Sequence, residues 1–202
     1  MKVIKPVTIT EDLLVSTNAV ETTPEWSSTT TYGINDVVYY GYKGIYKSLT
    51  SSNLNHQPDT SINNWLWISS TNKWSMFDSQ VSTTTDRMTS ITVKLKIGAI
   101  DTLALLNLTA SVVSVTVRET VSDSSPLIYS GTQSLDNTIL LDWYDYFFTP
   151  LAERRTQAVF YSVNSTYANA HATITITNTL DVEASIGLVT FGNLVTLGST
   201  EL

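Results

Sequence analysis

The stretch ATITITN, at Ala172–Asn178, is the clearest structural signal in the sequence. Because successive side chains of a β-strand point to opposite faces, Ile174 and Ile176 are expected on one face and the threonines between them on the other. Alternation or enrichment in β-branched residues predicts further strands at Val3–Thr10, Asp36–Tyr40, Gly44–Leu49, Ser90–Leu95, Thr102–Leu106, Val112–Arg118, Leu127–Gly131, Ala158–Ser162 and Ala184–Phe191. No long segment repeats its apolar residues at about 3.6 positions, so the sequence predicts an all-β fold.

The order of these signals divides the chain into two unequal parts. An early block is dense in Trp and Tyr, whereas the later residues hold many strands with turns spaced as in a sandwich. Trp74, Met76 and Phe77 make the connection too apolar for a free linker, so the two parts are expected to pack together. The predicted units are an N-terminal strand or arm at 1–23, a small aromatic-centred β module at 24–69, a packed junction at 70–78 and an antiparallel, jelly-roll-like β-sandwich at 79–202.

The N-terminal MKVIKPVTIT is too regular in its apolar pattern for a free tail. We expect Val3, Val7 and Ile9 on one side of a strand that pairs with a sheet. Pro6 cannot donate a ladder hydrogen bond, which places this strand at an edge. Short helical turns are predicted at Thr10–Leu14 and Thr149–Arg155.

The composition narrows the function classes. The 202 residues carry a net charge of −7 with scattered basic residues, which argues against nucleic-acid binding. The N-terminus has no apolar stretch of signal-peptide length, and no segment has the roughly 20 apolar residues that membrane insertion requires. Only 14% of residues are charged, which suits a protein packed among partners or a Thr-rich β protein. Both interpretations remain open.

The aromatic block, WSSTTTYGINDVVYYGYKGIYKSLTSSNLNHQPDTSINNWLWIS at residues 26–69, is too small for an ordinary core and must use large aromatic side chains. The adjacent pair Tyr39 and Tyr40, and the neighbouring Trp65 and Trp67, supply more rings than one small core can hide. The block resembles the family 5/12 carbohydrate-binding modules of chitinases at Trp26, Thr30, Tyr32, Gly33, Asp36, Val38, Tyr40, Gly44, Tyr46, Lys47, Ser48, Pro58 and Trp65.

That resemblance implies stacking of sugar rings on exposed aromatic side chains. The candidate carbohydrate-binding residues are Trp26, Tyr32, Tyr40, Tyr46, Trp65 and Trp67. Some of them are expected in the core of the module. The alternative, that an exposed Trp contacts a neighbouring subunit, stays open.

The later residues resemble the galactose-binding-like, discoidin-type jelly roll at LALLNL (103–108), VSVTV (113–117) and IGLVTFG (186–192). Within LDWYDYFFTPLAERR, the carboxylates Asp142, Asp145 and Glu153 suit acid–base catalysis or calcium binding. The alternative is a solvated turn beside a buried cluster of Trp143, Tyr146, Phe147 and Phe148. His56 and His171 lack a nucleophile or metal partner at a recognisable spacing. We therefore predict no catalytic residue, no metal, no cofactor and no enzymatic activity.

The whole chain resembles a group of bacteriophage particle proteins at MKVIKPVTIT (1–10), TNKWSMFD (71–78) and DWYDYFFTP (142–150). The resemblance implies a structural protein of a phage tail, in the baseplate, nozzle or fibre-attachment region, made in the host cytoplasm and located in the virion. It would assemble with other tail proteins as a homo-oligomer or symmetric assembly, and contact with host surface glycans stays open. The alternative is a carbohydrate-binding module or receptor-binding protein that recognises a surface polysaccharide; a glycan depolymerase is a distant third.

Overall fold

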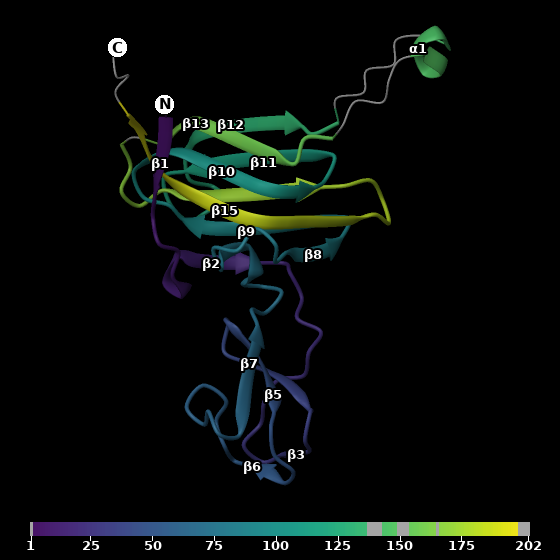
Figure 1. The fold of residues 1–202 in the computed structure, drawn as a ribbon. Helices are drawn as coiled ribbons and strands as arrows, with labels where there is room; N and C mark the ends of the chain where they lie inside the picture. The colour runs from purple at the N-terminus through teal and green to yellow at the C-terminus, as the bar shows by residue number, and fades with distance from the viewer. Residues whose placement is uncertain (1, 137–142, 149–153, 165, 198–202) are drawn as a thin grey trace, which may run out of the picture.

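The computed structural model describes residues 2–136, 143–148, 154–164 and 166–197. Most of them form a sandwich of two five-stranded sheets in which every strand pair is antiparallel, and a small module hangs from one side of it (Figure 1). The first sheet runs in the order β1 (Lys2–Pro6), β15 (Glu183–Thr196), β10 (Ile100–Thr109) and β13 (Gln157–Asn164), with β8 (Thr85–Met88) also on β15. The second runs in the order β12 (Leu127–Ser134), β11 (Val112–Arg118), β14 (His171–Thr177), β9 (Ser90–Lys96) and β2 (Leu14–Thr17). The predicted all-β fold and antiparallel sandwich are confirmed.

The sandwich core follows the alternation of the strands. Ile174 and Ile176 of β14 are buried between the sheets, and the threonines that alternate with them lie on the outer face, as predicted. From the opposite sheet, Leu103 and Leu105 of β10 and Phe191 of β15 meet them in one core cluster. Full burial of each such side chain contributes about 1.5–3 kcal/mol, so this core supplies most of the stability of the domain.

The N-terminal strand lies at a sheet edge, as Pro6 predicts. In β1, Pro6 pairs with Gly192 of β15, and the next residue continues the contact when the Val7 N–H donates to the Phe191 carbonyl at 2.9 Å. Gly192 is needed here, because a Cβ at this position would overlap the carbonyl of Lys5.

The N-terminal strand is shorter than predicted: β1 ends at Pro6, so of the three residues expected on one side only Val3 lies within it. Val3 and Val7 are 39% and 41% exposed, where β1 pairs with the last residues of β15. Only Ile9 packs against the core. The arm continues through a 3-10 helix at Glu11–Leu13, inside the predicted helical turn, and β2 then joins the second sheet. Segment 1–23 thus contributes a strand to each sheet of the sandwich.

The junction is built into the sandwich. Trp74, Met76 and Phe77 are buried in the sandwich core, around a 3-10 helix at Ser75–Phe77. Asn72 links three segments: its side-chain amide donates to the carbonyls of Val20 and Asp86, both at 2.9 Å, and its backbone N–H donates to Glu21 at 2.7 Å. The arm, the junction and β8 are therefore held together by one side chain.

Helix α1 spans Trp143–Phe148. Most of the helical turn predicted at Thr149–Arg155 lies outside the described residues, and its last two residues, Arg154 and Arg155, are not helical. Trp143, Phe147 and Phe148 were expected in a buried cluster, yet Trp143 is 77% exposed and the two Phe side chains are also exposed. The side chain of Tyr146, the fourth member of that cluster, lies outside the described residues. The ribbon of the helix stands apart from the sandwich (Figure 1). No helix in the described residues is long and apolar enough to span a membrane.

The small module contains two sheets. A three-stranded sheet has the order β4 (Val37–Tyr40), β5 (Gly44–Ser48) and β7 (Trp65–Ser69), and a two-stranded one pairs β3 (Thr31–Tyr32) with β6 (Asn53–Leu54). The turn before β4 places Asn35 at a φ of 71°, a conformation that Asn tolerates. Asp36 stabilises this turn, because its carboxylate accepts the Gly33 N–H at 2.6 Å.

Candidate functional site

The strand register of the module gathers aromatic side chains on one face. Val38 pairs with Tyr46, Tyr46 pairs with Trp67, and Ser48 pairs with Trp65. Residues directly opposite each other in a sheet share a face, so Tyr46, Trp65 and Trp67 project to the same side. Tyr40 lies on this side too, two positions after Val38.

Two of the six candidate residues form the core of the module. Trp65 is 3% exposed and packs edge-on against Tyr32, with ring centroids 5.2 Å apart. The Trp65 indole N–H donates to the His56 carbonyl at 2.8 Å, and the Tyr32 hydroxyl accepts the Ser27 N–H at 2.6 Å. Neither ring can therefore stack on a ligand, which corrects their assignment as sugar-contacting residues.

The other four candidates form what we call the aromatic surface: Trp26, Tyr40, Tyr46 and Trp67. Trp67 is 49% exposed and the other three are half-buried. Trp26 meets Tyr40 edge to face with centroids 5.4 Å apart. The indole N–H of Trp26 is buried without a hydrogen-bond partner. The rings of the aromatic surface are therefore partly buried, and this burial holds them in position.

Tyr46 lies at the centre of the aromatic surface, and Gly44 sets its position. A Cβ at position 44 would lie 2.8 Å from both Cζ and Oη of Tyr46, so the ring can lie flat on the strand only above a glycine. Burial raises the pKa of the Tyr46 hydroxyl, and the nearby Asp59 carboxylate and Tyr40 raise it further. The Asp59 carboxylate also accepts a hydrogen bond from the side-chain amide of Gln57 at 2.7 Å.

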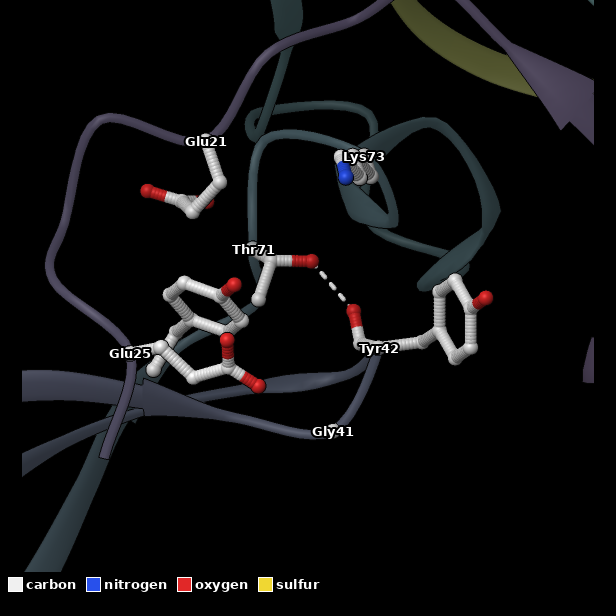
Figure 2. Close-up of a pocket in the computed structure, with 7 residues that line it drawn as sticks. Glu21, Glu25, Gly41, Tyr42, Thr71 and Lys73 are labelled. Carbon is white, nitrogen blue, oxygen red and sulfur yellow. Dashed lines mark hydrogen bonds between the residues drawn. The ribbon is translucent and has the colours of Figure 1, made fainter. Parts of the chain in front are cut away.

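A second concave site lies where the arm, the module and the junction meet. We call it the junction pocket; it has a volume of about 250 Å³ and is lined by Glu21, Glu25, Tyr39, Gly41, Tyr42, Thr71 and Lys73. Figure 2 shows the two glutamates on the left and Lys73 at the upper right, across from Glu21. Tyr39 projects to the opposite face of β4 from Tyr40, so this pocket is separate from the aromatic surface.

Polar contacts fix the walls of the junction pocket. The Glu21 carboxylate accepts the N–H groups of Thr23 at 2.9 Å and of Asn72 at 2.7 Å. The Thr71 hydroxyl donates to the Tyr42 carbonyl (Figure 2). Because these bonds join all three segments, the pocket exists before any ligand enters it.

Some charged groups of the junction pocket have hydrogen-bond partners, and Lys73 has none among the described residues. Burial raises the pKa of the Tyr39 hydroxyl, and so do its hydrogen bond with Glu25 and the negative charges of Glu25 and Glu21. Lys73 makes no hydrogen bond or ion pair within the part of the chain that the structure describes. Sequence patterns missed this pocket; the only signal was the adjacent Tyr39 and Tyr40, one of which had to face away from the aromatic surface.

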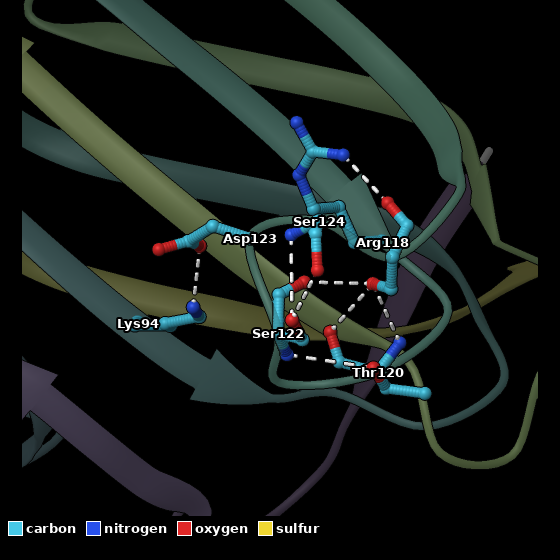
Figure 3. Close-up of polar contacts among 7 residues, drawn as sticks. Lys94, Arg118, Thr120, Ser122, Asp123 and Ser124 are labelled. Atoms are coloured by element: carbon cyan, nitrogen blue, oxygen red, sulfur yellow. Dashed lines mark hydrogen bonds and ion pairs between the residues drawn. The ribbon is translucent and has the colours of Figure 1, made fainter.

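The loop between β11 and β12 carries a cluster of polar groups that bond to one another (Figure 3). Arg118 donates to the Ser125 carbonyl at 2.6 Å, and the Ser125 hydroxyl donates to the Ser122 carbonyl at 2.8 Å. Lys94 pairs with Asp123 at 2.7 Å. Since these partners are internal, the cluster stabilises the loop.

The predicted acidic cluster is not described. Asp142 and Glu153 lie outside the described residues, as does the side chain of Asp145. Among the residues that the structure does describe, no three His, Cys, Asp or Glu side chains converge as a metal site requires. The expectation that these carboxylates do no chemistry stays a prediction.

Comparison with known proteins finds a likeness only among solved structures. No family model and no curated protein matches the chain. A GH29 fucosidase of Ruminococcus gnavus, solved with fucose, has a TM-score of 0.43 at 11% identity over 61% of this chain, which spans only 22% of the fucosidase. A chitosan-binding module of a Paenibacillus chitosanase/glucanase has a TM-score of 0.37 at 10% identity, over 59% of this chain and 83% of the module.

A third similar structure is the C-terminal domain of a Bacteroides fragilis chitobiase. It has a TM-score of 0.39 at 13% identity over 62% of this chain and 83% of that domain. Identities this low, with TM-scores below 0.5, establish neither a family nor a ligand. The function must follow from the residues of this chain.

Proposed function

We propose that this protein binds carbohydrate and that the aromatic surface of its small module is the sugar-binding site. The observation that carries the proposal is Trp67, a Trp about half exposed beside Tyr46 on the same face of a rigid sheet. A sugar ring has an apolar C–H face, which suits a flat aromatic ring, and hydroxyls, which suit a carboxylate such as Asp59. Exposure of a Trp side chain to water is energetically unfavourable, and Trp is enriched at binding sites.

The exposure pattern supports a binding role over a purely structural one. Tyr32 and Trp65 already fill the core of the module. Trp67 is not part of that core, so packing of the core does not explain why a Trp occupies this exposed position. Its neighbours in β7, Leu66 and Ile68, are also exposed, but they lie on the opposite face of the strand, so Trp67 is the exposed apolar side chain of β7 on the side of Tyr46.

The test is retention on polysaccharides. Wild-type protein is run through native gels containing soluble polysaccharides and incubated with insoluble chitin and cellulose. We expect retention by at least one polysaccharide and a loss of about tenfold or more in affinity for Trp67→Ala, since stacked aromatic contacts at binding sites contribute about 2 kcal/mol or more. Trp143→Ala is the matched control, because it removes another exposed Trp on α1. Equal retention of the Trp67→Ala and wild-type proteins would refute the proposal.

We also propose, as a second function, a structural role in a phage tail, where the chain would assemble with other tail proteins and with copies of itself in the virion. The exposed aromatic side chains of α1 favour it: Trp143, Tyr144, Phe147 and Phe148 all face solvent. Large exposed apolar groups mark interaction surfaces. Under this proposal the protein carries out no catalysis, and glycan binding would attach the particle to its host.

The structural role predicts a defined assembly. Light scattering of the purified protein should give a fixed multiple of the 22.3 kDa chain, and mass spectrometry of purified virions should find the protein. A strictly monomeric protein that is absent from particles would leave only the carbohydrate-binding proposal.

A further inference from the structure

The junction pocket is a preformed cavity that the aromatic surface does not use. Glu21 and Glu25 come from the arm, Tyr39, Gly41 and Tyr42 from the β4–β5 hairpin, and Thr71 and Lys73 from the junction. The bond from Asn72 to Glu21 and the bond from Thr71 to Tyr42 hold these three segments together. A ligand that enters therefore meets groups already in position, which reduces the entropy cost of binding.

The polar groups that line the pocket are of both kinds. Both oxygens of Glu21 already accept backbone N–H groups and Glu25 bonds to the Tyr39 hydroxyl, but each carboxylate oxygen has a second lone pair that can accept from a ligand. The Lys73 ammonium, which has no partner among the described residues, donates hydrogen bonds. A sugar hydroxyl both donates and accepts, so a ring with several hydroxyls can bond to both sides at once. Hydrogen bonds to charged groups are roughly twice as strong as neutral ones.

The charges of the pocket select against anionic ligands. Two carboxylates line it, so an acidic sugar or a phosphate would be repelled. Lys73 offsets one of these charges and supplies a hydrogen-bond donor. A neutral polyhydroxylated ring meets no such repulsion, and the rings of Tyr39 and Tyr42 offer apolar surface for its C–H face.

The volume of the pocket limits the size of the ligand. At about 250 Å³ it lies below the range of about 300–1,000 Å³ that is typical for drug-sized ligands. One pyranose ring fits such a space and a trisaccharide does not. We infer that the junction pocket binds a single neutral hexose unit, independently of the aromatic surface. This inference deepens the proposed function, on which it rests, by adding a second sugar subsite.

The inference is tested with simple sugars on the full-length chain. Amide NMR spectra are recorded while methyl α-glucopyranoside, methyl β-galactopyranoside or methyl α-mannopyranoside is added, with the Gly41 and Thr71 amides as reporters. We expect saturable shifts at these amides with at least one of the three sugars. We expect Glu25→Gln and Lys73→Met each to weaken binding about tenfold, the effect of losing one hydrogen bond to a charged group.

Matched variants exclude a general effect of charge. Glu183→Gln and Lys2→Met remove the same charges at exposed positions of β15 and β1, and should bind as the wild type does. Glu25→Gln and Lys73→Met leave the Asn72–Glu21 and Thr71–Tyr42 bonds in place, so an unchanged spectrum elsewhere will show that they fold.

The outcomes separate this inference from the proposed function. Absence of shifts with all three sugars, or shifts that survive both pocket variants, would overturn the inference. If the shifts vanish in Trp67→Ala but persist in Lys73→Met, the sugar lies on the aromatic surface; the inference then fails while the proposed function stands. If the pocket responds as expected but Trp67→Ala keeps full polysaccharide retention, the aromatic surface fails and the pocket remains.

Discussion

The ammonium of Lys43 lies 4.8 Å from the centroid of the Trp74 ring. Lys43 belongs to the β4–β5 turn of the module, whereas Trp74 is buried in the sandwich core and packs against Phe77 with centroids 5.3 Å apart. The same lysine pairs with Glu11 of the arm at 3.7 Å. One exposed cation therefore joins the module to the core of the sandwich and to its N-terminal segment.

Because of this contact, substitution of Trp74 measures how much the junction contributes to stability. Trp74→Ala removes a buried ring and leaves a cavity, so the free energy of unfolding should fall by about 3–5 kcal/mol. Urea denaturation measures it. Lys43→Met is the companion variant: it removes only the cation above the ring and should cost no more than about 1 kcal/mol. An unfolding curve of Trp74→Ala that overlays the wild type would show that the ring contributes nothing to the core.

Gly44 should not tolerate a side chain. Gly44→Ala places a methyl group against the Tyr46 ring, and the ring must leave its place on the strand. Overpacking of this kind costs about 1–3 kcal/mol, and it also displaces the centre of the aromatic surface. Thermal unfolding reports the stability change. Gly41→Ala is a useful comparison, since a Cβ there meets no atom within 4 Å and only its φ of 66° opposes the change. A wild-type melting curve for Gly44→Ala would show that the ring has room to move.

The edge strand β1 should depend on Gly192. Gly192→Val puts a side chain where the Lys5 carbonyl lies and should detach β1 from β15. The Val7 amide, which now donates to Phe191, should then exchange its hydrogen much faster, while the Thr175 amide in the centre of the second sheet stays protected. Hydrogen exchange measured by NMR follows both. Slow exchange at Val7 in the variant would mean that β1 is held by other contacts.

His171 should make the stability depend on pH. Burial lowers the pKa of its imidazole, and the positive charges of Lys96 and Lys94 lower it further, against a hydrogen bond to the Asn169 carbonyl that raises it. The unfolded chain therefore takes up this proton more readily than the folded one. Stability is full above the unfolded pKa of about 6.5 and falls as the pH drops through the lowered folded value.

The variant His171→Gln should remove that part of the pH dependence. Urea unfolding at pH 7.5 and pH 5.5 gives the difference for each protein. The loss of stability between the two pH values should be smaller in His171→Gln than in the wild type. His56→Gln, on an exposed loop of the module, should keep the wild-type difference. Equal differences in all three proteins would rule out His171 as the source.

Much of the fold follows from local sequence. Val112–Arg118 is a strand over the predicted range, and Ile174 and Ile176 face the core as their alternation requires. Alternation is a property of one strand and needs no partner to be recognised. Short or irregular strands such as β3, β6 and β8 were missed, because two to four residues carry too little pattern.

The aromatic centre of the early block is evident from its residues alone, whereas the exposure of each ring depends on which distant segments pack over it. Trp65 and Trp67 lie two positions apart on the same face of one strand, yet one is 3% and the other 49% exposed. Tyr32 and the backbone at His56 cover the first and not the second. The residues that cover Trp65 come from distant segments, so no local sequence pattern can indicate that this side chain is buried.

The junction pocket shows the same division. Glu21 and Lys73 are 52 positions apart, and nothing in the residues around either one indicates a site. They meet because the arm returns past the junction, where Asn72 binds Glu21. Strand faces are set by the geometry of single residues, whereas a pocket is set by how whole segments cross, and that depends on the packing of the complete chain.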